Sequence, residues 1–178
     1  MEVVRELLAR GAAVDAAAND GVTPLFFASE MGHLEVVREL LARGAAVGAA
    51  RNGGFTSLYI ASQNNHLEVV RELLARGAAV DAAMNDGWTP LLIASEMGHL
   101  EVVRELLARG AAVDAARNNG ATPLLMASQE GHLEVVRVLL ASGASPRTAA
   151  NNGATALFHA TANGHYAVAA LLRAALAR

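Results

Sequence analysis

Two amino acids are missing from the 178-residue sequence: it has no cysteine, and all 14 of its basic residues are arginine. The absence of cysteine excludes disulfide bonds, thiolate nucleophiles and zinc sites built from cysteine. The absence of lysine excludes Schiff-base catalysis and a Walker A phosphate loop, which both need a lysine amine. Several large classes of enzyme are therefore ruled out by composition.

Aromatic residues are scarce, at 4%, and 17 acidic residues leave a net charge of −3. A net acidic chain is a poor candidate for general binding to nucleic acid or to a membrane surface. The longest stretch without a formal charge, residues 148–172, is interrupted by asparagines, glycines and histidines, so we do not expect it to span a membrane. The first residues also lack the apolar centre of a signal peptide. We expect a soluble, intracellular (cytoplasmic) protein.

What the sequence has in abundance is repetition. Glycine, histidine and threonine each recur every 33 residues, for example at Gly11, Gly44, Gly77, Gly110 and Gly143. The period divides the chain into a half unit (1–19), four complete units (20–52, 53–85, 86–118 and 119–151) and a shortened unit (152–178). Because repeated units stabilise one another by stacking, we treat residues 1–178 as one domain.

Each unit reads as a turn, a helix, a second turn and a second helix. In the third complete unit, the Thr89 hydroxyl can cap a helix, and Pro90 suits its first position. This helix is predicted over 91–97 and ends at Gly98, which tolerates a left-handed backbone. A second helix is predicted over 100–109. Its apolar arc is wide, which suits a helix that contacts a partner helix and neighbours on both sides.

The motifs of this unit resemble the ankyrin repeat. They are Thr89-Pro90-Leu91, then Gly98-His99-Leu100-Glu101-Val102-Val103, then Leu106-Leu107 and Gly110-Ala111, and the period of 33 agrees with that family. The resemblance covers essentially the whole chain. It implies an all-α solenoid of stacked helix-turn-helix units with short β-turn or hairpin-like fingers. It also implies a non-catalytic module whose partners bind the concave face formed by the fingers and the first helices.

The repeats depart from the family pattern at a few positions. Ser57 and Ala156 replace the proline, and Asn65 replaces the glycine between the helices. Asparagine is the next-best residue for a left-handed backbone. In the loop after the second helix, Gly48 and Asp81 replace an asparagine that is usual in the family.

The first and third complete units differ at only four of 33 positions, so the remaining variation is informative. Such uniformity indicates a recent duplication or an engineered array. An engineered or designed scaffold with no natural partner is therefore the alternative to a binding module. Variation is concentrated at the finger tips and just before them, along the middle of the first helix, and at the end of that helix. A solenoid would place these strips on one continuous concave surface.

We therefore predict that the chain recognises a protein or peptide through this surface. The predicted partner-binding residues are Arg51, Phe55, Tyr59, Gln63, Asn64, Met84, Trp88, Glu96, Met97, Arg117, Gln129 and Glu130. Trp88 is the strongest candidate anchor, because tryptophan is over-represented among binding hot spots. The alternative for Trp88 is packing on a neighbouring turn, for instance against Phe55.

Other repeated polar residues are assigned structural roles. Histidines at equivalent positions of stacked helices lie about 8–10 Å apart, too far to share a zinc ion without other ligands, so we predict a structural turn role for them. The repeated serines at 29, 62, 95 and 128 lack a nucleophile elbow and are expected in the core. We expect no metal, no cofactor and no enzyme activity, and a monomer that associates end to end at high concentration.

Overall fold

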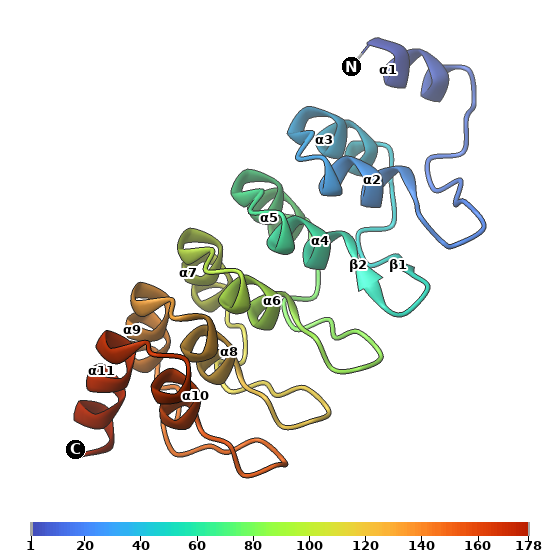
Figure 1. Ribbon diagram of the computed structural model, residues 1–178. Helices are drawn as coiled ribbons and strands as arrows, with labels where there is room; N and C mark the ends of the chain where they lie inside the picture. The colour runs from blue at the N-terminus through green and yellow to red at the C-terminus, as the bar shows by residue number, and fades with distance from the viewer. Residues whose placement is uncertain (1, 178) are drawn as a thin grey trace.

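The computed structural model describes residues 2–177. Helix pairs follow one another in a single row from the N-terminus to the C-terminus, and the loops between pairs project on one side as fingers (Figure 1). The half unit contributes α1 (Glu2–Ala9). The following units contribute the pairs α2 (Pro24–Glu30) and α3 (Leu34–Ala42), α4 (Ser57–Gln63) and α5 (Leu67–Ala75), α6 (Pro90–Glu96) and α7 (Leu100–Ala108), α8 (Pro123–Glu130) and α9 (Leu133–Ala141), and α10 (Ala156–Ala162) and α11 (Tyr166–Leu176). We call the first helix of each pair the inner helix and the second the outer helix.

Every inner helix begins with the same threonine cap. The hydroxyl oxygens of Thr23, Thr56, Thr89, Thr122 and Thr155 accept the backbone N–H three residues further on, at 3.1 to 3.3 Å. This bond satisfies one of the N–H groups that a helix start leaves without a partner. The cap also holds in the units where Ser57 and Ala156 replace proline, so the cap suffices to start the helix.

The turn between the two helices of a pair requires a left-handed residue. Gly98 has a φ of 73°, and Asn65, at the equivalent position, has a φ of 61°. Asn65 is the only residue other than glycine with a positive φ within residues 2–177, which confirms the role expected for it. The helices of the third complete unit, α6 and α7, each end one residue earlier than predicted, because Met97 and Arg109 occupy the caps.

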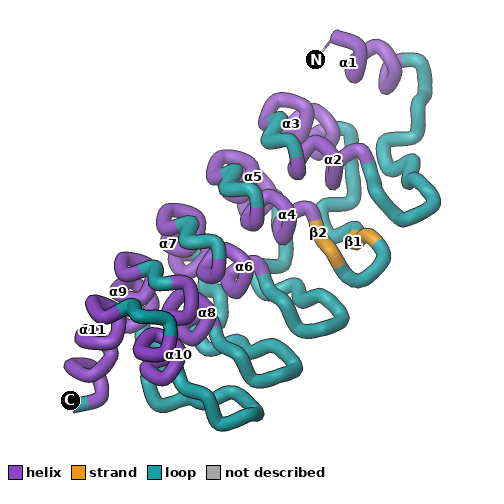
Figure 2. The backbone as a smooth tube through the Cα atoms, viewed as in Figure 1, coloured by secondary structure: helices purple, strands orange, loops and turns teal. Residues whose placement is uncertain are grey.

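The fingers are short hairpins, as the resemblance implied. Strand β1 (Ala50–Arg51) pairs antiparallel with β2 (Phe55–Thr56), with Arg51 opposite Phe55. Figure 2 shows both strands in orange within one finger, while the other fingers are drawn as loops. Those fingers close with similar bonds, such as the 2.8 Å bond from the Met84 N–H to the Trp88 carbonyl.

One hydrophobic core runs through the stack from Leu25 to Leu172. In α7, Val102, Val103 and Leu106 are fully buried, and this outer helix contacts both its inner helix α6 and the neighbouring outer helices α5 and α9. The wide apolar arc predicted for this helix is thus confirmed. The repeated serines are also fully buried, as expected, at Ser29, Ser62, Ser95 and Ser128.

The repeated histidines join consecutive units. The Nε2 atoms of His66, His99, His132 and His165 lie 2.8 to 3.0 Å from the backbone carbonyls of Glu30, Gln63, Glu96 and Gln129. A carbonyl can only accept, so Nε2 is the protonated nitrogen and donates. Each acceptor lies at the end of the preceding inner helix, where carbonyls lack helical partners. The structural role predicted for these histidines is confirmed.

Candidate partner-binding surface

The ends of the inner helices form the first part of the candidate surface, which we call the inner-helix end strip. It consists of Glu30, Met31, Gln63, Asn64, Glu96, Met97, Gln129 and Glu130. Met31 and Met97 are 51% and 47% exposed, although methionine is usually a buried side chain. Asn64 and Glu130 are also exposed, and Gln63, Glu96 and Gln129 are half-buried. Every predicted residue of this strip therefore presents surface to solvent.

Part of the polar chemistry of this strip is used inside the protein. The Asn64 side-chain amide donates to the Glu30 carbonyl at 2.9 Å. The Gln129 amide donates to the Glu130 carboxylate at 3.0 Å. These bonds fix the orientation of the amides, so that part of the surface is organised before any partner arrives.

In α4, α6 and α8 the middle of the inner helix is not part of an exposed surface, and the expectation that it would be is wrong for these three helices. Tyr59, Leu92 and Leu125 are 4%, 0% and 3% exposed, and their neighbours Ile60, Ile93 and Met126 are 8% or less. The helical wheel places these residues opposite the core, but α4, α6 and α8 each also contact the inner helices on both sides. These neighbours cover the middle of the helix and turn it into an interface between units.

Tyr59 shows the electrostatic effect of this burial. Burial raises the pKa of the Tyr59 phenol to about 12, and the carboxylates of Asp86 and Glu96 add to the shift, while Arg117 opposes it. The ring also meets Phe55 edge to face, with the ring centroids 5.5 Å apart. Tyr59 thus supports Phe55 from below, and direct contact of Tyr59 with a partner stays a prediction.

The fingers form the second part of the surface. Their arginines form ion pairs with aspartates of the preceding finger. The Arg51 guanidinium lies 5.6 Å from the Phe55 ring centroid and 6.0 Å from that of Phe26 in α2. Its Nε is also 3.4 Å from an oxygen of Asp20 in the preceding finger. Arg51 therefore connects two fingers as well as presenting a charge.

Trp88 and Arg117 repeat this arrangement in closer contact. The Arg117 guanidinium lies 4.3 Å from the Trp88 ring centroid, within the range of a cation–π interaction. Arg117 also pairs with Asp86 at 3.3 Å. Trp88 is half-buried and packs against a small cluster made by Leu92, Ala121, Leu125 and Met126. Apart from Leu92, the residues of this cluster belong to the following unit. The sequence suggested packing of Trp88 against Phe55 in the preceding unit.

Two acidic side chains, Glu96 and Glu130, lie close to each other and to Arg117. Burial raises the pKa of the Glu96 carboxyl, and the nearby carboxylate of Glu130 raises it further, while Arg117 lowers it. Glu96 and Glu130 therefore repel each other on the same face. Met97 lies next to Glu96 in sequence and is exposed. Met84, in the second complete unit, is half-buried. The contact of Arg117 with Trp88, and the influence of Arg117 and Glu130 on Glu96, bring these predicted residues of the third and fourth complete units close together.

The rest of the described chain offers little for other chemistry. No group of three or more histidine, aspartate or glutamate side chains in residues 2–177 is arranged to hold a metal ion. None of the helices in this range has both the length and the apolar character needed to cross a membrane.

Sequence reasoning missed the contacts that join the outer helices. Arg38 pairs with Glu72 at 3.1 Å and Arg71 with Glu105 at 3.0 Å, each between consecutive units. The available signal was the 34-residue separation of each pair, one more than the repeat period.

Comparison with known proteins agrees with the geometry. A family model described as ankyrin repeats (3 copies) matches residues 1–51, 46–117, 76–150 and 109–177. A search of the curated proteins finds no match. Ankyrin repeats are generally protein–protein interaction modules and are typically not enzymes. The family model spans almost the entire chain, and its repeats coincide with the stacked helix pairs and fingers, so this chain belongs to the ankyrin-repeat family.

Proposed function

We propose that the chain is a non-catalytic binding module that recognises a basic segment of another protein through its fingers and inner-helix end strip. The observation that carries the proposal is the exposure of Met31 and Met97 beside acidic side chains on one face. Methionine adapts its shape to apolar partners and is favoured at binding surfaces. The proposed anchors are Met97, Trp88 and Phe55.

The charge of this face supports a basic partner. Glu30, Glu96 and Glu130 lie along the inner-helix end strip, and Arg51 and Arg117 are already paired with aspartates of the fingers. The mutual repulsion of Glu96 and Glu130 would be relieved by an arginine or lysine side chain from a partner. Gln63, Asn64 and Gln129 would contribute adaptable hydrogen bonds around this contact.

The fixed geometry of the face also favours binding. Bonds between successive fingers hold them in place, for example from the Asn118 N–H to the Asp86 carbonyl at 3.2 Å. The histidine bonds hold the ends of the inner helices in the same way. Because these groups are already ordered, association costs less conformational entropy than binding by a flexible loop.

Selection from a random peptide library displayed on phage tests the proposal. We expect enriched peptides to combine arginine or lysine with an apolar residue. The glutamate-to-glutamine change Glu96→Gln should weaken their binding about fivefold, because it removes one charge from the contact. Isothermal titration calorimetry with an enriched peptide measures the change.

The matched control is Glu101→Gln, the same chemical change on the outer helix α7, where the Glu101 side chain is 57% exposed. This variant should bind the enriched peptide as the unchanged protein does. Equal loss in both variants would place the contact elsewhere and overturn the proposal. Recovery of no peptide above background would favour a scaffold without a partner.

We expect Trp88→Ala to weaken the binding of the same peptide more strongly, by about 2 kcal/mol in binding free energy. Trp88 also packs on Leu92 and Leu125, so its removal lowers stability as well. Binding is therefore measured well below the unfolding temperature of the variant, which circular dichroism determines. Unchanged affinity in a folded Trp88→Ala variant would exclude the anchor role.

A further inference from the structure

The outer helices are joined at three successive junctions by a repeated arrangement, which we call the clamp. In each clamp a glutamate forms an ion pair with one arginine of the preceding helix in this row and a second ion pair with the arginine four residues further along its own chain segment. Glu72 lies 3.1 Å from Arg38 and 3.1 Å from Arg76, and Glu105 lies 3.0 Å from both Arg71 and Arg109. Arg5, Glu39 and Arg43 form the first clamp, at 3.1 and 3.2 Å.

The clamp glutamates are well covered. Their side chains are 15 to 16% exposed, although the arginines around them are 39% exposed or more. The hydrogen bonds that Arg38 and Arg71 donate to Glu72 and Glu105 raise the pKa of both arginines above its ordinary value. The clamp therefore shows which chemistry suits this place between two outer helices: a carboxylate on a short aliphatic stem, set among arginines.

The junction between α7 and α9 lacks two of the three members. The equivalent residues are Arg104, Val138 and Ser142. Valine removes the carboxylate, and serine removes the second guanidinium. Within residues 2–177, Arg104 has an ion pair only with Glu101 of its own helix, at 3.1 Å. The donors that Arg38 and Arg71 direct to the following unit have no acceptor from α9 here.

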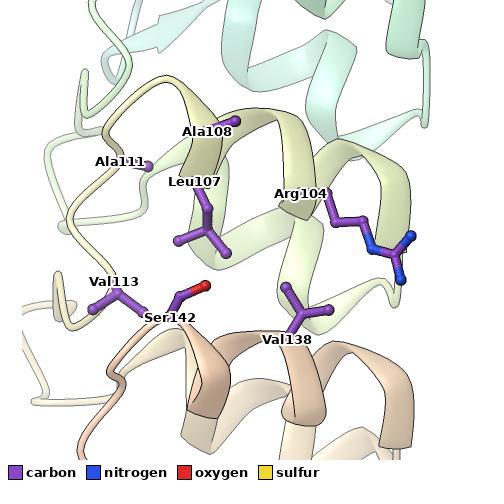
Figure 3. Close-up of a pocket in the computed structure, with 7 residues that line it drawn as sticks. All are labelled: Arg104, Leu107, Ala108, Ala111, Val113, Val138 and Ser142. Atoms are coloured by element: carbon purple, nitrogen blue, oxygen red, sulfur yellow. The ribbon is translucent and has the colours of Figure 1, made fainter.

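A pocket of about 420 Å³ lies at this junction. Val138 and Ser142 rise from α9 toward Leu107 of α7, and Arg104 lies at one side (Figure 3). Ala108, Ala111 and Val113 complete the wall with apolar side chains. Valine and serine are smaller than the glutamate and arginine of the other junctions, which accounts for the space. Its polar groups are the Arg104 guanidinium and the Ser142 hydroxyl.

We propose that this pocket is a second binding site, in which Arg104 and Ser142 hold a glutamate side chain of a partner protein flanked by aliphatic residues. The partner glutamate takes the place of the clamp carboxylate, and its aliphatic neighbours contact Leu107, Val113 and Val138. The site is on the outer helices, so it is independent of the proposed binding of a basic segment at the fingers and inner-helix end strip.

The next junction provides a comparison. Between α9 and α11, a pocket of about 390 Å³ is lined by Arg137, Leu171 and Ala175, among others. Leu171 and Ala175 are the equivalents of Val138 and Ser142 there, so Arg137 has no hydroxyl group opposite it. Of the two junctions that lack the clamp carboxylate, the one that contains Arg104 combines a guanidinium with a second donor at the clamp positions, which is why the proposal assigns the site to this junction.

The test is a titration with a blocked tetrapeptide, acetyl-Leu-Glu-Leu-Leu-amide, followed by NMR of the methyl groups of Leu107 and Val138. We expect saturable shifts of these methyls, and about tenfold weaker binding of the glutamine analogue of the peptide, since the charge-assisted bond is lost. Arg104→Gln should remove the difference between the two peptides. Val138→Glu should abolish binding, because it restores the internal carboxylate.

Arg137→Gln and Arg71→Gln are the matched controls, and neither should change the shifts at Leu107 and Val138. Circular dichroism confirms that each variant is folded. Equal affinity for both peptides, no shift at millimolar peptide, or an unchanged response in Arg104→Gln would overturn the proposal. Shifts that grow with protein concentration before peptide is added would identify a second copy of the chain as the occupant and would also overturn it.

Discussion

The same side chain has different environments at the end and in the middle of the stack. Leu7 in α1 and Leu106 in α7 occupy the same position of the repeat, in the identical sequence Glu-Val-Val-Arg-Glu-Leu-Leu-Ala. Leu106 is fully buried, whereas Leu7 is 54% exposed. The half unit has no inner helix of its own among the described residues to cover α1. Burial here is therefore a property of the neighbouring helices and not of the residue.

The inner helices show which neighbour covers which position. Phe27 is 56% exposed, but its equivalents in the following complete units are 8% or less. Phe158 is 60% exposed in the last unit, but its equivalents in the preceding units are 4% or less. Burial at the position of Phe27 thus depends on the preceding unit. Burial at the position of Phe158 depends on the following unit. Each end of the stack exposes one half of an interface that is complete inside.

The test with the largest expected effect compares the variants Leu106→Ala and Leu7→Ala. We expect Leu106→Ala to lower the free energy of unfolding by about 3 kcal/mol, through lost burial and a cavity. Leu7→Ala should cost less than about 1 kcal/mol, since much of the side chain is already in water. Urea unfolding followed by circular dichroism measures both. Similar losses would mean that the half unit is covered in solution.

The second test uses the high pKa of Tyr59. An unfolded tyrosine ionises near pH 10, whereas folded Tyr59 keeps its proton until about pH 12. The unfolded state therefore loses its proton first, and the contribution of Tyr59 to the free energy of unfolding should be constant well below pH 10. It should fall by about 2 kcal/mol as the pH rises from about 10 to about 12.

Tyr59→Phe should remove this part of the pH dependence. Absorbance at the phenolate band reports ionisation directly, and urea unfolding reports stability. Phe158→Tyr supplies the end-of-stack counterpart, because that position is 60% exposed; the introduced phenol should titrate near pH 10. If both phenols titrate together, the interior position is not sealed by its neighbours.

The third test concerns the loop after each outer helix. Asp15, Asp81 and Asp114 accept the backbone N–H of Ala46, Ala112 and Ser145 in the following unit, at 3.1 to 3.3 Å. Gly48 stands at this position in the first complete unit and cannot accept. A Cβ atom at Gly48 would have no heavy atom within 4 Å, and its φ is not in the left-handed region.

Gly48→Asp should therefore stabilise the protein by about 1 kcal/mol, by adding the bond to the next unit and by restricting the unfolded chain. Asp81→Gly should destabilise by a similar amount. Thermal unfolding of both variants measures the effect. A destabilised Gly48→Asp would show that this junction differs in backbone geometry from the other three.

The smallest expected effect is association between copies. Phe27 and Phe158 expose the two halves of the unit interface at opposite ends of the stack. Residues 152–178 carry two arginines and no acidic residue, whereas residues 1–19 carry two arginines against three acidic residues. We propose weak end-to-end association at millimolar concentration, which light scattering detects as a rising mass. Phe158→Asp should abolish it, and a constant monomer mass would disprove it.

Much of the fold could be predicted from the 33-residue period. The threonine caps, the left-handed Asn65 and the buried serines follow from local chemistry, and each is confirmed. Part of the candidate surface also followed, because Met97 and Glu130 are exposed as predicted. The burial of Tyr59 did not follow. A helical wheel describes one helix, and Tyr59 is covered by helices from two other units.

The sequence by itself determined, to within one residue, where the predicted helices begin and end, and that the units stack. Capping and backbone preference act within a single unit. The periodicity is the same from one unit to the next. Only the tertiary structure decided that Arg117 lies on Trp88, that identical leucines differ in exposure, and that Arg104 borders a pocket. These features depend on contacts between successive fingers and between helices of different units, which are set by how neighbouring parts of the stack approach each other.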